Sequence, residues 1–173
     1  MIISMISKQT FIAKLQNEVR IIKHLASKAT TPELLHFRLS DNQRTTAQWL
    51  AYIALVGVAG AKDILSDDAS GFETFMDDMD NFDVNNFDTI FDKNVADMIA
   101  IIDAVSDEKL HEEKTMFGRI TDTRAGHLMT SVYNWHVAYK TQIFLQLKVA
   151  GLKDLGTMNL WGGMDAPVKE SSQ

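Results

Sequence analysis

The side chains that could do acid–base or metal chemistry are few and scattered along this 173-residue sequence. It contains no cysteine, which excludes a thiol nucleophile, a disulfide framework, Cys-ligated zinc and an iron–sulfur cluster. The five histidines stand at positions 24, 36, 111, 127 and 136. The last two are nine residues apart, so they lie on nearly opposite faces of a helix that carries both. That pair therefore cannot chelate one metal ion.

Two short segments come close to metal-binding motifs. Residues 111–115 (HEEKT) begin like the zinc motif H-E-x-x-H, but threonine stands where the second histidine is needed. We expect this segment to be a solvated charged turn. Asp78-x-Asp80-x-Phe82 fails the calcium-loop pattern at its fifth position, which leaves only weak calcium or magnesium association open. The sequence also has no glycine-rich phosphate loop and no G-x-S-x-G motif.

Charge and hydropathy exclude several classes of partner. The formal net charge is -6, and an acidic protein repels the phosphates of nucleic acid. The longest uncharged apolar stretch, 49–61, is shorter than the ~20 residues that cross a bilayer. The apolar start, 1–6, lacks the basic region of a secretory signal, and we expect it to pack against the domain. The sequence thus predicts a soluble cytoplasmic protein that binds neither nucleic acid nor a membrane.

The elements that must position any site are predicted to be helices. Only nine glycines and two prolines interrupt the sequence, and apolar residues recur at helical spacing. Long helices are expected at about 8–28, 45–65, 90–104 and 122–150, with a short turn near 33–38 and a tail over 152–173. We therefore predict one all-α domain over 1–173, a four-helix bundle.

The second helix carries clear local signals. Thr45 or Thr46 can cap its start. Gly57 and Gly60 lower its helix propensity, so their benefit is expected to be close approach of a neighbouring helix.

The fourth helix has the widest apolar face. It follows a cap within 121–123 and stops at Gly151. Tyr133, Val137 and Phe144 widen its apolar stripe beyond one seam, which indicates a partner surface. We expect a homodimer.

An acidic, phenylalanine-rich stretch separates the second and third helices. Residues 66–94 carry nine acidic residues against one lysine, and five of the nine phenylalanines. Disordered acidic tails are poor in aromatics, so we interpret this stretch as a crossover that its phenylalanines hold against the bundle. It is long enough for helices two and three to run parallel, in up-down-down-up order. A docking surface for a basic protein is the alternative interpretation.

Two segments resemble the second and fourth helices of the DinB/YfiT-like superfamily: Thr45-x6-Tyr52-Ile53-Ala54, and 139–151 (YKTQIFLQLKVAG). The resemblance implies an up-down-down-up bundle that commonly dimerises. Members include metal-dependent thiol transferases and isomerases. In these enzymes one histidine on helix two and an H-x3-H pair on helix four bind a divalent metal.

This sequence departs from that pattern at every ligand position. In the family's register the helix-two position is Tyr52, and the helix-four positions are Trp135 and Tyr139. A shift by one residue gives His136 with Lys140, which supplies one imidazole. Trp and protonated Lys offer no lone pair for a metal, and Tyr is an uncommon ligand. The resemblance therefore implies the fold without its metal site, and we expect no cofactor. The tail 157–165 resembles that of a subgroup with the same replacement.

The same five residues are the candidate site, as a small-ligand pocket made of Tyr52, Trp135, His136, Tyr139 and Lys140. Each also has a purely structural interpretation: core packing for the rings, a core histidine bonded to a neighbour, and a lysine that extends its amine to solvent. We predict a dimeric small-ligand-binding or interaction module. A metal-free or metal-dependent transferase or isomerase that uses Tyr52, His136 and Lys140 is the alternative, so catalysis is left open.

Overall fold

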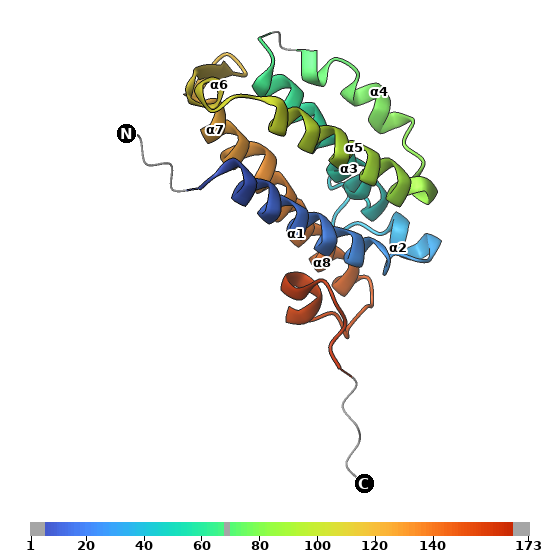
Figure 1. Ribbon diagram of the computed structural model, residues 1–173. Helices are drawn as coiled ribbons and strands as arrows, with labels where there is room; N and C mark the ends of the chain where they lie inside the picture. The colour runs from blue at the N-terminus through green and yellow to red at the C-terminus, as the bar shows by residue number, and fades with distance from the viewer. Residues whose placement is uncertain (1–5, 68–69, 168–173) are drawn as a thin grey trace.

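Four long helical rods form the protein in a computed structural model that describes residues 6–67 and 70–167. The first three rods are α1 (Lys8–Ala26), α3 (Thr46–Leu65) and α5 (Phe87–Ala104). The fourth is continuous from α7 (Arg124–His127) through a π-helical segment (Leu128–Tyr133) to α8 (Asn134–Val149). Figure 1 shows the rods packed side by side, with α5 lying against α3. The predicted all-α class is confirmed.

Specific contacts give the relative directions of α3, α5 and α8. Asn94 of α5 donates a hydrogen bond to the Ala54 carbonyl at 3.1 Å, and one turn further along both helices Met98 lies against Gly57. The helices α3 and α5 are therefore parallel. Because Gly57 also contacts His136, while Gly60 contacts the earlier Trp135, α8 runs antiparallel to α3.

Helix α3 lies in the core of the bundle. It is long and apolar enough to cross a membrane, but 78% of its most apolar window is buried inside the protein, as in the core helix of a soluble protein. Its start is closed by a capping box between Thr45 and Gln48. A Cβ built on Gly57 would lie 2.6 Å from His136 Cε1, and one on Gly60 2.4 Å from Trp135 Cζ3. The predicted cap and the predicted close approach are both confirmed.

The fourth rod begins and ends as predicted but contains an unexpected π-helical segment. Thr123 caps its start, since its hydroxyl accepts from the Gly126 amide at 3.0 Å. The rod ends at Ala150, and Gly151 follows with φ 121°. A π-helical turn takes in more residues than an α-helical turn. Side chains before Leu128 and after Tyr133 are therefore rotated relative to the regular α-helical spacing.

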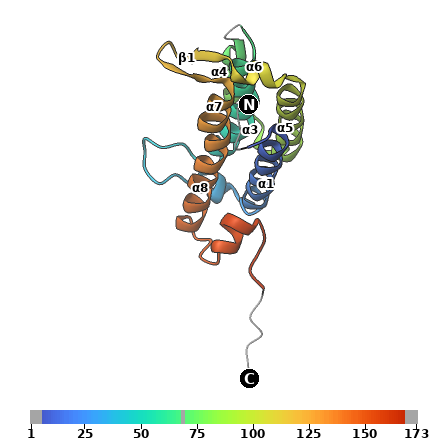
Figure 2. The ribbon, with the colours of Figure 1, turned by 60° about the vertical axis from the view of Figure 1, so that its left-hand side comes forward.

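A β-hairpin stands where the sequence predicted a solvated turn. The short helix α6 (Asp107–His111) leads into β1 (Glu113–Met116), which pairs antiparallel with β2 (Ile120–Thr123). Figure 2 shows the hairpin projecting from one end of the bundle. The prediction failed because these strands are mostly exposed and polar, so no alternation of buried and exposed residues marks them. At the tip, Phe117 adopts φ 53° and Gly118 φ 67°.

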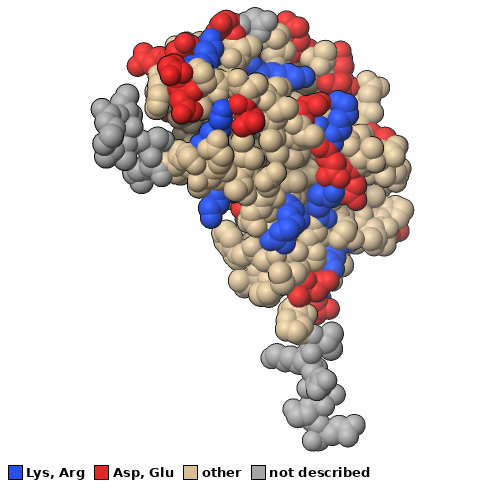
Figure 3. Space-filling model, viewed as in Figure 1, with Lys and Arg blue, Asp and Glu red and all other residues tan. Residues whose placement is uncertain are grey.

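The acidic crossover folds as three short helical pieces: η1 (Ser70–Phe72), α4 (Phe75–Asp80) and η2 (Val84–Asn86). Phe75, Phe87 and Phe91 are buried. The prediction that phenylalanines hold this stretch against the bundle is confirmed. Acidic side chains gather at the upper end of the molecule and along α5, while the middle of the same face carries few charges (Figure 3).

Two short helical pieces lie at the end of the bundle opposite the hairpin. Helix α2 (Pro32–His36) forms the turn expected near 33–38, and a π-helical turn (Met158–Gly162) forms part of the predicted tail. Arg20 donates to the Gly162 carbonyl at 2.7 Å, and Lys28 pairs with Asp165 at 2.6 Å, so both bonds tie this turn to α1. The expected packing of the amino end and the final residues of the tail involve 1–5 and 168–173, which lie outside the described residues.

Candidate functional site

Three of the five predicted site residues carry rings that lie along one side of α3 and α8. The ring centroids of Tyr52 and Tyr139 are 4.9 Å apart, with their planes nearly perpendicular. Trp49, one turn before Tyr52, stacks on Tyr139 at 5.0 Å. Both arrangements are favourable for aromatic pairs. Tyr52 and Tyr139, which the resemblance assigns to two metal-ligand positions, are therefore in contact in the structure.

The row of rings continues through the crossover. Phe75 lies 5.3 Å from Tyr52, and Phe72 lies 5.5 Å from Phe75 and 6.2 Å from Trp135. Phe117 at the hairpin tip lies 6.3 Å from Phe72. We call the rings along the bundle the ring cluster: Trp49, Tyr52, Phe72, Phe75, Trp135 and Tyr139. All of them except Phe75 are partly exposed.

The polar groups at one end of the ring cluster are unusual. Burial, together with the hydrogen-bonded phenol of Tyr139, raises the pKa of Tyr52 to about 12. The Arg44 guanidinium lies 4.5 Å from the Tyr52 centroid and 5.1 Å from that of Trp49. The indole N–H of Trp49 is buried and has no hydrogen-bond partner within residues 6–67 and 70–167. This end therefore offers donors and a cation beside apolar rings.

His136 lies in the bundle core and does not face the ring cluster's polar end. Its side chain is buried against Gly57, and its ring stacks on Phe91 at 6.4 Å. Nδ1 lies 2.7 Å from the Val132 carbonyl, which can only accept, so Nδ1 carries the proton. Nε2 is then a buried acceptor that no described residue donates to. Desolvation lowers the pKa of His136. The interpretation as a core histidine bonded to a neighbour is confirmed.

Lys140 points toward α1. Its side chain is fully buried, and its Nζ lies 2.5 Å from Oε2 of Glu18 on α1. Trp161 of the π-helical turn covers the pair, with its ring centroid 5.0 Å from Nζ. The expectation that Lys140 extends its amine to solvent is wrong. A buried carboxylate on α1 compensates the charge, and no pattern in the α8 sequence signals that partner.

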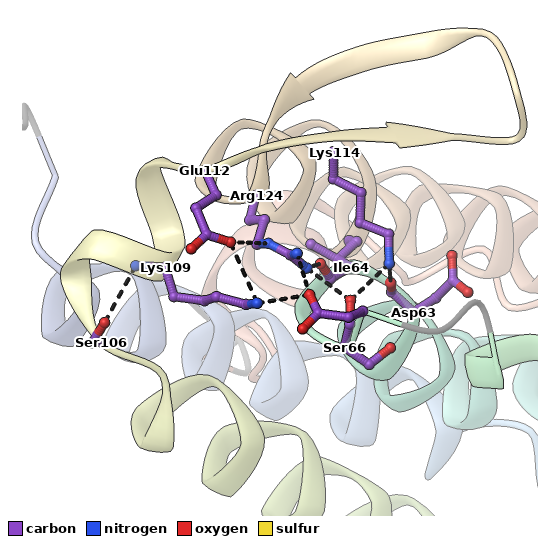
Figure 4. Close-up of polar contacts among 9 residues, drawn as sticks. Asp63, Ile64, Ser66, Ser106, Lys109, Glu112, Lys114 and Arg124 are labelled. Carbon is purple, nitrogen blue, oxygen red and sulfur yellow. Dashed lines mark hydrogen bonds and ion pairs between the residues drawn. The ribbon is translucent and has the colours of Figure 1, made fainter.

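A second polar cluster, at the carboxyl end of α3, fastens the hairpin (Figure 4). The nearly buried Arg124 donates to the carbonyls of Ile64 and Ser66 at 2.6 and 2.8 Å, and it pairs with Asp67 at 2.7 Å. Lys114 bonds the carbonyls of Asp63 and Ser66. Cations at a helix carboxyl end satisfy its unpaired carbonyls and its dipole. We therefore interpret this cluster as structural.

The residues that the resemblance assigns to metal-ligand positions have side chains unsuited to a divalent metal. Trp135 offers no lone pair, and Tyr52 and Tyr139 pack edge to face and hydrogen-bond to each other. His136 supplies one imidazole, with its Nε2 enclosed by Gly57 and Met98. Over the described ranges, no group of three or more His, Asp or Glu side chains is placed to hold an ion.

Comparison with known proteins supports the fold. No protein-family model and no curated protein matches this chain. Among solved structures, a DinB-like protein from Bacillus subtilis, YjoA, is similar with a TM-score of 0.68. The likeness covers 84% of this chain and 94% of that one, at 16% sequence identity. At this identity the likeness establishes the fold alone, so the fold is DinB-like.

Sequence reasoning missed three participants: Glu18, Arg44 and Trp49. Glu18 had a signal, because a glutamate between apolar positions of the first helix lies on the buried face. Trp49 lies one turn before Tyr52, so helical spacing alone places it beside that ring. Arg44 had no signal, since it belongs to the loop before α3 and its position depends on the fold of that loop.

Proposed function

We propose that this chain acts by binding a small ligand or a partner, without metal-assisted catalysis, and that the ring cluster is its binding surface. One observation carries the proposal: the rings of Tyr52, Trp135 and Tyr139, which the resemblance assigns to metal-ligand positions, join a partly exposed row along α3 and α8. Aromatic side chains with polar tips provide a large contact area at low entropic cost. A cytoplasmic location is part of the proposal.

The catalytic alternative has less support from the geometry. A general acid and base must reach one substrate together. Tyr52 packs among rings, whereas His136 bonds its own helix and Lys140 pairs with Glu18 on the α1 side. Over the described residues these three groups make no hydrogen bond, ion pair or ring contact with one another, and each faces different neighbours. We therefore retain binding as the proposed function.

The proposed function includes a homodimer. Leu145, Val149 and Trp161 are exposed apolar side chains on α8 and the turn that follows it. A two-fold interface sets the same surface patch of two copies against each other, and burying unpaired charges there would be costly, so a surface with few charges suits it. Sedimentation equilibrium should give twice the chain mass. Val149→Lys should lower the dimer fraction, whereas the control Met76→Lys on α4 should not. A monomer at all concentrations would contradict this part of the proposal.

A matched pair of tyrosine variants tests the binding surface. Phenol and indole, as small aromatic probes, should raise the melting temperature of the wild-type protein. Tyr139→Leu removes a ring at the centre of the ring cluster and should abolish the rise. Tyr133→Leu is the control, because that ring packs on Phe11 against α1. Equal shifts in all three proteins would contradict the proposal.

A further inference from the structure

We propose that the end of the ring cluster nearest α2 binds a carboxylate attached to an apolar or aromatic body, with Arg44 as the anion-pairing group. This inference rests on the proposed function, since it names the ligand class of the same surface. It concerns Arg44 and Trp49, together with the phenols of Tyr52 and Tyr139. Three features carry it: the Arg44 guanidinium, the buried indole N–H of Trp49 and the neighbouring aromatic rings.

The first observation is the cation. Arg44 makes contact with the faces of Trp49 and Tyr52 through its guanidinium, and no ion pair joins it to any described residue. The described surface is otherwise rich in paired cations: Lys23 with Asp92, Lys28 with Asp165 and Lys109 with Asp67 are examples. An arginine held over two rings keeps its five donors available for a bidentate acceptor.

The second observation is the unused donor of Trp49. Buried indole N–H groups almost always find an acceptor, because leaving one unpaired costs stability. Here the Nε1 atom is buried and has no hydrogen-bond partner among the described residues, and the Arg44 guanidinium lies over the same indole, 5.1 Å from the ring centroid. A bound carboxylate draws the guanidinium outward. One of its oxygens then accepts hydrogen bonds from Arg44, and the other accepts one from the Trp49 indole N–H. Both groups donate, and neither can accept, which selects an anion over a cation.

The third observation is that the loop carrying Arg44 has a fixed base. Gln146 of α8 is buried and donates to the carbonyls of Phe37 and Arg44 at 2.7 and 3.3 Å. It also donates to the Thr46 hydroxyl at 3.1 Å. Figure 2 shows the loop between α2 and α3 projecting beside α8. The backbone of Arg44 is thereby anchored, while its guanidinium lies over two rings, forms no ion pair with a described residue and can turn toward a ligand.

The rings supply the apolar part of the recognition. Trp49 and Tyr139 are stacked with an angle of 28° between planes, and Tyr52 closes the edge. Ligand sites commonly combine such apolar walls with a few polar groups that fix orientation. Cationic ligands are disfavoured by Arg44. A planar aromatic carboxylate matches both the ring faces and the donors.

Isothermal titration calorimetry with phenylacetate and its neutral isostere phenylacetamide tests the inference. The wild-type protein should bind the acid at least tenfold more tightly than the amide. Arg44→Gln should abolish this difference. Arg38→Gln is the matched control in the same loop, because Arg38 already donates to the Asp41 carbonyl, and it should preserve the difference. Arg44→Lys should keep part of the preference, since it retains charge without the planar fork.

The outcomes separate the inference from the function on which it rests. Equal affinities for acid and amide in the wild-type protein, both lost in Tyr139→Leu, would overturn the inference and leave the ring cluster as a binding surface. An acid preference that survives in Arg44→Gln would also overturn it. Absence of binding by either probe would overturn both the inference and small-ligand binding at this surface.

Discussion

Tyr139, Lys140 and His136 lie within five positions of one helix, yet each has a different environment. Tyr139 faces α3 and Trp49, Lys140 faces Glu18 on α1, and His136 lies in the core against Gly57. Tyr139 and Lys140 are consecutive, so their side chains are rotated by about 100° from each other. His136 and Lys140 are four positions apart on one helix face, but His136 bonds its own helix whereas Lys140 reaches Glu18 on α1. At the residue scale, the predicted five-residue pocket therefore divides into a ring surface, a core histidine and a buried ion pair.

The ion pair predicts strongly non-additive mutations. Glu18→Gln or Lys140→Met leaves one buried charge without its partner, and each should lower the free energy of unfolding by about 3–5 kcal/mol. The double variant Glu18→Gln/Lys140→Met removes both charges and should lose much less than the sum. Urea unfolding measures all three. Additive losses would show that the pair is not coupled as the 2.5 Å contact indicates.

His136 predicts a pH dependence of stability. Because burial lowers its folded pKa, the unfolded chain takes up a proton near its ordinary pKa of 6.5 while the folded chain does not. The free energy of unfolding should therefore fall as pH decreases from about 7.5 to 5. His136→Leu should flatten this slope, whereas His36→Asn at an exposed position should not. An unchanged slope in His136→Leu would assign the effect to other groups, such as His24.

At the element scale, the caps and glycines of α3 could be predicted, and the hairpin and the π-helical segment could not. Thr45 caps the helix through a residue three positions away, and Gly57 leaves room for a neighbouring helix. Both signals can be recognised in a short stretch of sequence. The β1–β2 pair depends on Arg124 and Lys114 bonding the end of α3, about 50 residues earlier in the chain. No local sequence pattern predicts these long-range contacts with the end of α3.

Gly57 gives an element-scale test of packing. Gly57→Ala adds a Cβ 2.6 Å from the buried His136 ring and 2.9 Å from Met98 Sδ. Overpacking should cost about 1–3 kcal/mol, even though alanine favours the helix. Gly156→Ala is the control, because its nearest neighbour would be 4.0 Å away. Thermal unfolding compares the two. A stabilised Gly57→Ala protein would show that the helices are not this close.

The hairpin tip predicts a stabilising substitution. Phe117 adopts a left-handed conformation that costs an ordinary side chain about 1 kcal/mol, while asparagine tolerates it better. Phe117→Asn should raise the free energy of unfolding by about 0.5–1 kcal/mol. Phe117→Ala removes the same ring contact but keeps the unfavourable φ, so it serves as the control. If the two variants were equally stable, backbone strain would not be the cause.

At the scale of the whole molecule, the sequence predicted the fold better than the site. Helical periodicity, caps and the acidic crossover depend on nearby residues, so the four rods and the crossover between the second and third could be derived. The ring cluster depends on which faces of α3, α8 and the crossover meet. Tyr52 and Tyr139 were found because a resemblance paired them, whereas Arg44 was missed because the loop that places it has no periodic pattern.

The central claim is that the ring cluster binds ligands in place of a metal centre, and the three tryptophans allow a direct test. Trp49 and Trp135 belong to the ring cluster, whereas Trp161 covers Lys140 on another side. Each indole N–H gives its own NMR signal. Titration with indole should shift the Trp49 and Trp135 signals and leave Trp161 unchanged. A shift confined to Trp161, or no shift at saturating probe, would contradict the account.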